Sequence, residues 1–178
     1  SAQSTLCLND FSVTEFERSN LINSVFGNSL TSLFQVFDFN VDEDINSISV
    51  SAKHDAYKKK FDYICERKIK INKKNGNLSG DDSLILNNNN TETSTIYDIR
   101  FHLYPGINAV QTIGKNAILI QVEKNNSLIF TSAGENISLE KSIFLGRNQI
   151  INNYCITISG ILTKNESKKI HWEFKKNN

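Results

Sequence analysis

The segment IYDIRFHLYPG, residues 96–106, decides the fold class of this chain because its apolar and polar residues alternate with a period of two. One face of the segment holds Tyr97, Ile99, Phe101 and Leu103, and the other holds Asp98, Arg100, His102 and Tyr104. Such alternation is typical of a β-strand that packs one face on a core and turns the other toward solvent. Pro105 and Gly106 predict the end of the strand.

The same alternation recurs from Phe61 to Asn72, where Arg67 is the one charged residue on the apolar face. We expect Arg67 to pair with an acid or with backbone carbonyls, or else to face an open cleft. The pair Asn75-Gly76 follows directly and predicts a type I′ hairpin turn, in which both central residues have positive φ. A short returning strand should run through Leu78.

Further strands are predicted at 5–8, 33–41, 48–52, 117–123, 127–131, 143–145, 154–162 and 170–175, with a tight hairpin at 124–126 and a surface loop at 86–94. No segment of ten or more residues keeps the apolar spacing of a helix, so helices should be short or absent. The pattern predicts one all-β domain over residues 1–178, built as a two-layer antiparallel β-sandwich. Trp172 and Phe174 should join the apolar face of 96–104 in its core.

Composition excludes several classes of protein. The chain has 178 residues, a net charge of +1 and a mean hydropathy of −0.35, and it lacks the run of about 18 apolar residues that a membrane-spanning helix needs. A balanced charge gives no overall basic field for nucleic acid. The three cysteines have no spacing typical of a disulfide framework or a thiolate zinc site. The chain contains no methionine and starts at Ser1, so we expect a fragment of a longer protein.

Six short strings occur in an order that resembles a known family: AQSTL at 2–6, HDAY at 54–57, ERKI at 66–69, LSGDD at 78–82, IRFHLYPG at 99–106 and FLG at 144–146. Together they resemble the carboxy-terminal β-domain of the heparinase II/III-like family of bacterial polysaccharide lyases. The resemblance covers nearly the whole chain. In that family an α/α toroid precedes the β-sandwich and the active site lies between them, so the resemblance implies that an N-terminal toroid is absent here.

The resemblance implies a role in cleaving uronic-acid-containing polysaccharide, such as a glycosaminoglycan, by β-elimination. A base must remove the proton beside the carboxylate while cations or hydrogen-bond donors neutralise that carboxylate. The family carries these groups mainly on segments that precede this chain, so no catalytic residue is assigned here. Where many members have a metal-binding His, this sequence has Gln3, which is a poor zinc ligand.

From the resemblance we therefore expect no cofactor in this fragment, a divalent metal such as zinc only in the full-length protein, and a periplasmic location. The expected partners are an acidic polysaccharide and the toroid of the same protein, with no nucleic acid and no membrane. The alternative is a noncatalytic carbohydrate-binding or structural β-sandwich module that has lost the active-site features.

Four residues are candidates for binding substrate: His54, Tyr57, Arg100 and His102. His54 and Tyr57 can donate hydrogen bonds to sugars and Tyr57 can stack on them, or the segment is a plain turn capped by Asp55. Arg100 and His102 share one strand face and suit capture of a carboxylate or sulfate. Ion pairing of Arg100 with Asp98 or Glu66 would explain it equally well.

Two charged clusters also have a functional and a plain interpretation. The acidic run 42–44 resembles a cation site, but adjacent side chains seldom converge, so a solvated turn is favoured. The lysines at 58–60 and 73–74 would attract an acidic chain if they shared one rim, and otherwise they are surface charge.

Overall fold

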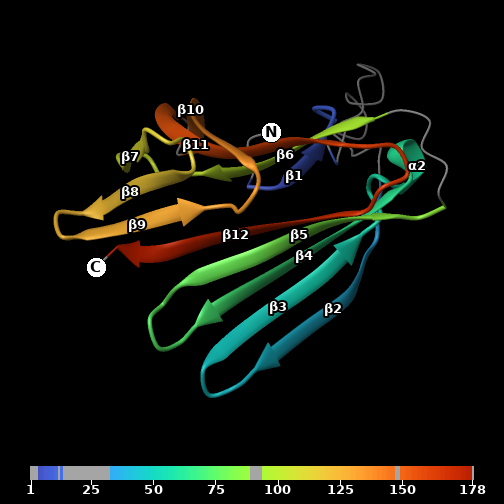
Figure 1. Ribbon diagram of the computed structural model, residues 1–178, viewed down its shortest axis with the longest axis horizontal. Coiled ribbons are helices and arrows are strands. Elements are labelled where there is room, and N and C mark those ends of the chain that lie inside the picture. The colour runs from blue at the N-terminus through green and yellow to red at the C-terminus, as the bar shows by residue number, and fades with distance from the viewer. Residues whose placement is uncertain (1–3, 12, 14–32, 89–93, 147–148, 178) are drawn as a thin grey trace, which may run out of the picture.

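The computed structural model describes residues 4–11, 13, 33–88, 94–146 and 149–177, and within them the strands form two antiparallel sheets. The large sheet has the strand order β2 (Val36–Glu43), β3 (Ser47–His54), β4 (Tyr63–Asn72), β5 (Leu78–Leu86), β12 (Lys168–Asn177), β9 (Asn126–Thr131), β8 (Ala117–Glu123) and β7 (Asn108–Gln111). The small sheet has the order β1 (Leu6–Leu8), β6 (Thr95–His102), β11 (Gln149–Leu162) and β10 (Asn136–Gly146). The predicted two-layer antiparallel sandwich is confirmed (Figure 1).

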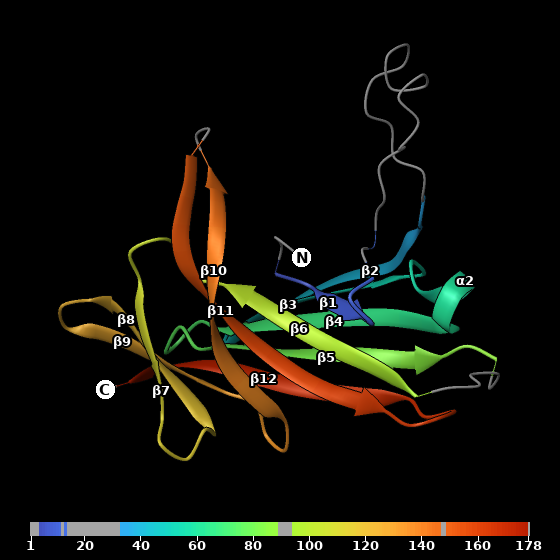
Figure 2. The ribbon, with the colours of Figure 1, turned by 90° about the horizontal axis from the view of Figure 1, so that it is seen from above.

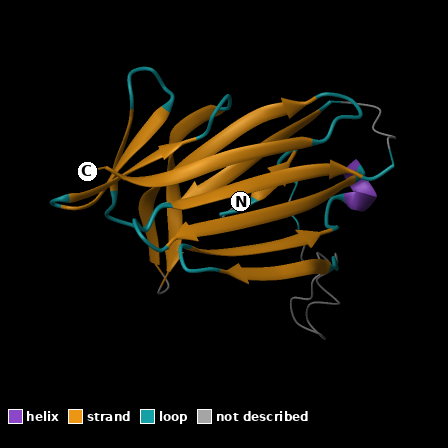
Figure 3. Cartoon of the chain, turned by 60° about the horizontal axis from the view of Figure 1, so that its bottom comes forward, coloured by secondary structure: helices purple, strands orange, loops and turns teal. Residues whose placement is uncertain are grey.

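The core lies between the two sheets. Strands β1, β6 and β11 of the small sheet lie over β4, β5 and β12 of the large one (Figure 2), and Figure 3 shows the long strands of the large sheet side by side. Tyr97 and Ile99 are fully buried, as predicted, and Phe101 is 9% exposed. The ring of Phe101 packs edge-on against Trp172, with ring centroids 4.8 Å apart. This aromatic contact joins the two sheets at their centre.

The register predicted for residues 96–104 is confirmed. Phe101 is buried while its neighbour His102 is partly exposed, so the polar set does face away from the core. Leu103 and Phe174 pack against the core but are only partly buried. Strand β6 ends at His102, two residues earlier than predicted, because Leu103 and Tyr104 begin the connection to β7.

Arg67, the charged residue on the apolar face of β4, is paired with an acid and a backbone carbonyl, as predicted. Its Nε and Nη2 donate to the two carboxylate oxygens of Asp82 at 2.7 and 3.0 Å, and its Nη1 donates to the carbonyl of Ser4 at 2.9 Å. Trp172 Nε1 donates to the same Asp82 carboxylate at 2.8 Å. Since the carboxylate of Asp82 is buried, this cluster satisfies a buried charge and ties the start of the chain to the large sheet.

The hairpin after β4 forms, but its turn is not the two-residue type I′ turn that Asn75-Gly76 predicts. Five residues, 73–77, connect β4 to β5, and Gly76 has a φ of 71° while Asn75 is absent from the residues with positive φ. The Gly76 amide donates to the carbonyl of Asn72. The side chain of Asn72 also accepts from the amides of residues 74 and 75, and these local bonds favour the longer loop.

Other sequence predictions differ from the structure mainly in length. Helix is confined to the four-residue α2 (Lys58–Phe61) within the described residues, and the tight hairpin between β8 and β9 forms as predicted. Strands β10 and β11 are longer than predicted, and β7 was not predicted. Most of the predicted loop 86–94 lies outside the described residues. The three cysteines are buried and unbridged, and no helix of the described segments is long and apolar enough to cross a membrane.

Candidate functional site

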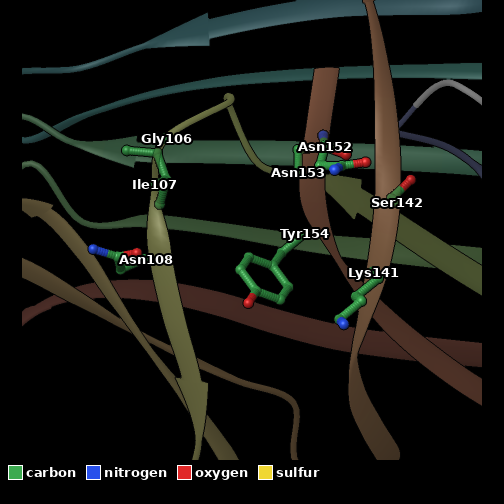
Figure 4. Close-up of a pocket in the computed structure, with 8 residues that line it drawn as sticks. All are labelled: Gly106, Ile107, Asn108, Lys141, Ser142, Asn152, Asn153 and Tyr154. Atoms are coloured by element: carbon green, nitrogen blue, oxygen red, sulfur yellow. The ribbon is translucent and has the colours of Figure 1, made fainter. Parts of the chain in front are cut away.

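A pocket of about 330 Å³ lies between the start of β7 and the β10–β11 hairpin (Figure 4). We call it the hairpin-base pocket, and its lining residues are Gly106, Ile107, Asn108, Lys141, Ser142, Asn152, Asn153 and Tyr154. Its volume is at the small end of the range of about 300–1,000 Å³ that ligand pockets span. The pocket therefore suits a small polar ligand or one unit of a longer chain.

Backbone bonds and one turn hold the two sides of the pocket together. Gly106 has a φ of 86°, a conformation that residues with a side chain rarely adopt, and it directs the chain from β6 into β7. The Leu103 amide donates to the carbonyl of Tyr154 at 2.9 Å, and the Asn153 side-chain amide donates to the carbonyl of Leu103 at 2.7 Å. Register pairs Lys141 with Tyr154 across the hairpin, which places their side chains on the same face.

The lining of the pocket combines one cation with neutral polar groups and an aromatic ring. Lys141 is the only charged residue among the eight and is exposed. Figure 4 shows its side chain and the ring of Tyr154 extending from the hairpin toward the side of Asn108. The Asn153 carboxamide oxygen is buried and has no hydrogen-bond partner in the part of the chain that the structure describes. Lys141 and Tyr154 share one face of the hairpin and allow attraction of an anion and ring stacking at one place, whereas Ser142 and Asn153 point to the opposite face.

Arg100 and His102 lie on the outward face of β6, which is the face of the small sheet opposite the one that carries Lys141 and Tyr154. His102 Nδ1 is 3.3 Å from the hydroxyl of Ser142, a pocket residue. Arg100 Nη2 donates to Asp10 at 3.2 Å and to Asp98 at 3.4 Å, and its side chain is 23% exposed. Burial disfavours the charged guanidinium, but the nearby Asp98 carboxylate and other groups outweigh it and raise the pKa of Arg100. The structure thus brings two of the four predicted residues to one accessible strand face.

His54 and Tyr57 lie elsewhere, at the end of β3 and the start of α2. Tyr57 has no exposed surface, and its hydroxyl donates to the carbonyl of Leu6 at 3.0 Å. Its burial raises the pKa of the phenol. His54 packs between Phe34 and Tyr57, with ring centroids 5.7 and 5.9 Å apart, and burial holds its pKa below the ordinary value. The contacts of Tyr57 are those of a core residue, while substrate binding by the four residues stays a prediction.

The turn around Asp55 differs in one respect from the predicted cap. The Asp55 carboxylate accepts from the amide of Gln35 at 2.7 Å, and α2 has no side-chain cap. Asp55 instead joins this turn to the residues before β2. The correction follows from tertiary structure, because Gln35 is 20 residues away in sequence.

The acidic run 42–44 does not converge on a common point. Glu43 pairs with Lys73 at 2.6 Å, while Asp44 accepts from the amides of Asn46 and Ser47 at 2.6 Å each. Those backbone bonds lower the pKa of Asp44. No group of three His, Cys, Asp or Glu side chains suited to a metal occurs in the described segments. The run therefore belongs to a strand end and a solvated turn.

The two lysine groups do not share a rim. Lysines 58–60 precede β4 and lysines 73–74 follow it, and a ten-residue strand separates them by roughly 30 Å. Gln3, the residue at the family's metal-binding position, lies outside the described residues. The pocket residues were missed in the sequence because Asn, Ser and Lys between predicted strands look like ordinary solvent-facing loop positions. Their only signal was a run of polar residues at 152–154, just before and at the start of the strand predicted at 154–162.

Comparison with known proteins agrees with this architecture. The sequence matches the family described as "Heparinase II/III-like, C-terminal" over residues 1–173. The heparan sulfate lyase HepC from Pedobacter heparinus has a TM-score of 0.73 at 12% identity over 99% of this chain and 24% of its own. A solved heparinase III has a TM-score of 0.68 at 14% identity over 98% of this chain and 23% of its own. A second solved heparinase III, the BT4657 gene product, has a TM-score of 0.64 at 7% identity over 80% of this chain and 22% of its own.

The structural matches and the family match differ in how much of each protein they cover. Identities this low show a shared fold, and the chain spans about a quarter of the length of the solved structures it resembles. A search of curated proteins finds no significant match. The family match, by contrast, covers nearly every residue of the chain.

Proposed function

The chain belongs to the heparinase II/III-like C-terminal family, and from this premise we propose that it is the β-sandwich part of a lyase that cleaves uronic-acid-containing polysaccharide by β-elimination. The observation that carries the proposal is the family match over residues 1–173. The shared fold with a heparan sulfate lyase supports it, since 99% of the chain takes part in the superposition. The proposed partner is an acidic polysaccharide.

The chemistry of such a reaction defines what this chain can contribute. Removal of the proton beside a uronate carboxylate builds negative charge on that carboxylate, and a nearby cation or donor stabilises it. Arg100 and His102 present such groups on one accessible face of β6. We assign them to substrate contact and assign no catalytic residue to the described part of the chain. The role proposed for the sandwich is to form a wall of the substrate cleft.

The remainder of the active site is proposed to come from a preceding α/α toroid of the same protein. The solved lyases are about four times as long as the part of them that this chain covers, which leaves room for such a domain. A divalent metal such as zinc enters the proposal only through the family resemblance. Since the described residues hold no metal-binding group, no step is assigned to a metal held by them. We also propose a periplasmic location, which fractionation of the source cells would test.

Two samples test the proposed function: this chain alone and the full-length protein that its gene encodes. Each is incubated with heparin, heparan sulfate and alginate, and the unsaturated product is followed by ultraviolet absorbance. We expect turnover from the full-length protein and none above buffer from the chain. Turnover by the chain alone would place the catalytic groups within it, with His54, Tyr57 and His102 the first to be replaced.

Binding without turnover in the full-length protein would refute the lyase proposal. The second candidate function is a noncatalytic carbohydrate-binding module, and the hairpin-base pocket is the observation that favours it. Equilibrium binding of the same polysaccharides to the full-length protein, measured beside the turnover assay, separates the two functions.

A further inference from the structure

We propose that the hairpin-base pocket is a binding subsite for one acidic sugar residue, a uronate or a sulfated sugar, of the polysaccharide. The inference rests on the proposed function for its polymer and on the pocket for its location. It gives a role to residues between 106 and 154 that the family resemblance does not assign. The ligand class follows from the size and charge of the pocket and from its aromatic ring.

Size and shape favour a single unit over a stretch of chain. At about 330 Å³ the pocket is small, and it lies between two separate elements rather than along an open sheet face. Its two walls are the 106–108 segment and the β10–β11 hairpin (Figure 4). A sugar residue that entered between these walls would leave its neighbours outside, where the polymer can continue.

Charge favours an acidic unit. Lys141 is the only ionised side chain among the lining residues, so no carboxylate in the lining competes for it. No ion pair of Lys141 is found among the described residues. An ammonium group on a flexible stem can follow a carboxylate or a sulfate through small shifts of the sugar. The attraction is that of an exposed pair, so added salt should weaken it.

The aromatic ring in the lining fits the remainder of a sugar. The ring of Tyr154 extends into the space between the walls, where it offers an apolar face to the C–H groups of a pyranose (Figure 4). Its neighbour Asn153 points to the opposite face of β11, where its side-chain amide donates to the Leu103 carbonyl. Lys141 and Tyr154 are therefore the two side chains that hold the sugar.

The predicted substrate contacts on β6 lie on the other face of the small sheet. Strand register sets Ser142 on the same face as His102, with its hydroxyl 3.3 Å from His102 Nδ1, and sets Lys141 and Tyr154 on the opposite face. The proposed subsite is therefore separate from the contacts predicted for Arg100 and His102.

Isothermal titration of this chain with three tetrasaccharides tests the subsite: one from heparin, one from alginate and neutral cellotetraose. The variants are Lys141→Gln, which removes the charge, Lys141→Arg, which restores it, and Tyr154→Ala, which removes the ring. Lys164→Gln is the matched control, because Lys164 is an exposed lysine in the turn between β11 and β12. Thermal denaturation of each variant shows whether it is folded, and Lys141→Gln keeps the test decisive if Tyr154→Ala does not fold.

We expect Lys141→Gln to raise the Kd of both acidic tetrasaccharides roughly 3- to 10-fold at low salt, with recovery in Lys141→Arg and no change in Lys164→Gln. Cellotetraose should bind more weakly than either acidic ligand and should not respond to Lys141→Gln. Equal binding of the neutral and acidic ligands would overturn the acidic class. Absence of binding, or equal losses in Lys141→Gln and Lys164→Gln, would overturn the subsite.

The lyase assay keeps this outcome separate from that of the proposed function. Elimination by the full-length protein together with Lys141-independent binding would refute the subsite and leave the lyase standing. Lys141-dependent binding of acidic sugar without elimination would support the subsite and refute the lyase.

Discussion

Replacing Asp82 by alanine should destabilise the sandwich strongly. The carboxylate of Asp82 accepts from Arg67 Nε, Arg67 Nη2 and Trp172 Nε1 at 2.7, 3.0 and 2.8 Å, and its side chain is 3% exposed. Asp82→Ala removes the acceptor for all three donors at once. It leaves the guanidinium and the indole N–H facing a space that no other described group fills.

The structure sets the size of the loss. Removing one partner of a fully buried ion pair typically costs 3–5 kcal/mol. The Arg67 side chain is 27% exposed and keeps its bond to the Ser4 carbonyl, so water can solvate part of the charge. An unpaired indole N–H adds about 1 kcal/mol. We therefore expect a loss of about 3 kcal/mol in the free energy of unfolding, which for a chain of this length lowers Tm by roughly 6–12 °C.

Asp81→Ala is the matched control, since Asp81 is the adjacent residue of the same type. Asp81 faces the opposite side of β5 and pairs with His171 at 2.8 Å and Lys169 at 3.2 Å, both of which are exposed. Such surface pairs contribute about 0–1 kcal/mol. Urea denaturation followed by tryptophan fluorescence measures both variants, because Trp172 reports directly on the cluster. Equal losses in the two variants would refute the view that the buried cluster stabilises this fold.

Three further predictions concern packing, pH and substrate. Gly80→Ala should lower the free energy of unfolding by about 1–3 kcal/mol, because a Cβ there would lie 2.2 Å from Trp172 Cζ2. Gly114→Ala is the control, since its Cβ would lie 3.4 Å from the nearest atom, and it should change that free energy by no more than about 0.5 kcal/mol. Urea denaturation measures both, and similar losses would contradict the packing argument. Burial lowers the pKa of His54, so the unfolded chain takes up this proton first as pH falls through about 6.5. The free energy of unfolding should therefore decrease as pH falls from that value toward the lower pKa of the folded chain, and an unchanged slope in His54→Phe would assign the effect to other groups. If the full-length protein has the proposed lyase activity, Arg100→Ala in it should lower kcat/KM roughly 10- to 150-fold with little change in Tm. Normal turnover with a large loss of Tm would show a structural role instead.

The sequence was most informative where a single strand carried the whole pattern. In residues 96–102 the burial of each side chain follows from whether its position is odd or even, because successive residues of a strand point to opposite faces. Tyr97, Ile99 and Phe101 are buried for this local reason. Six short strings sufficed for the family resemblance, and the all-β class followed from the absence of any long helical stripe.

The candidate site could be predicted only in part. The alternation of residues along the strand was enough to predict that Arg100 and His102 lie on its outward face, and the structure puts them there. Tyr57 looked like a loop residue in sequence, yet it is fully buried because α2 turns its ring back toward β1. The hairpin-base pocket was invisible, since its two walls are more than 30 residues apart in the chain.

Local patterning therefore determined which segments are strands and which of their faces is apolar, while tertiary structure decided which strands are neighbours. Strand pairing joins Arg67 to Asp82 across β4 and β5, and the same kind of register sets Lys141 beside Tyr154. The physical reason is that a period of two repeats identically in every strand and carries no information about its partner. The partner is chosen by how the two apolar faces fill one core and how each buried polar group is paired, which are properties of the whole fold.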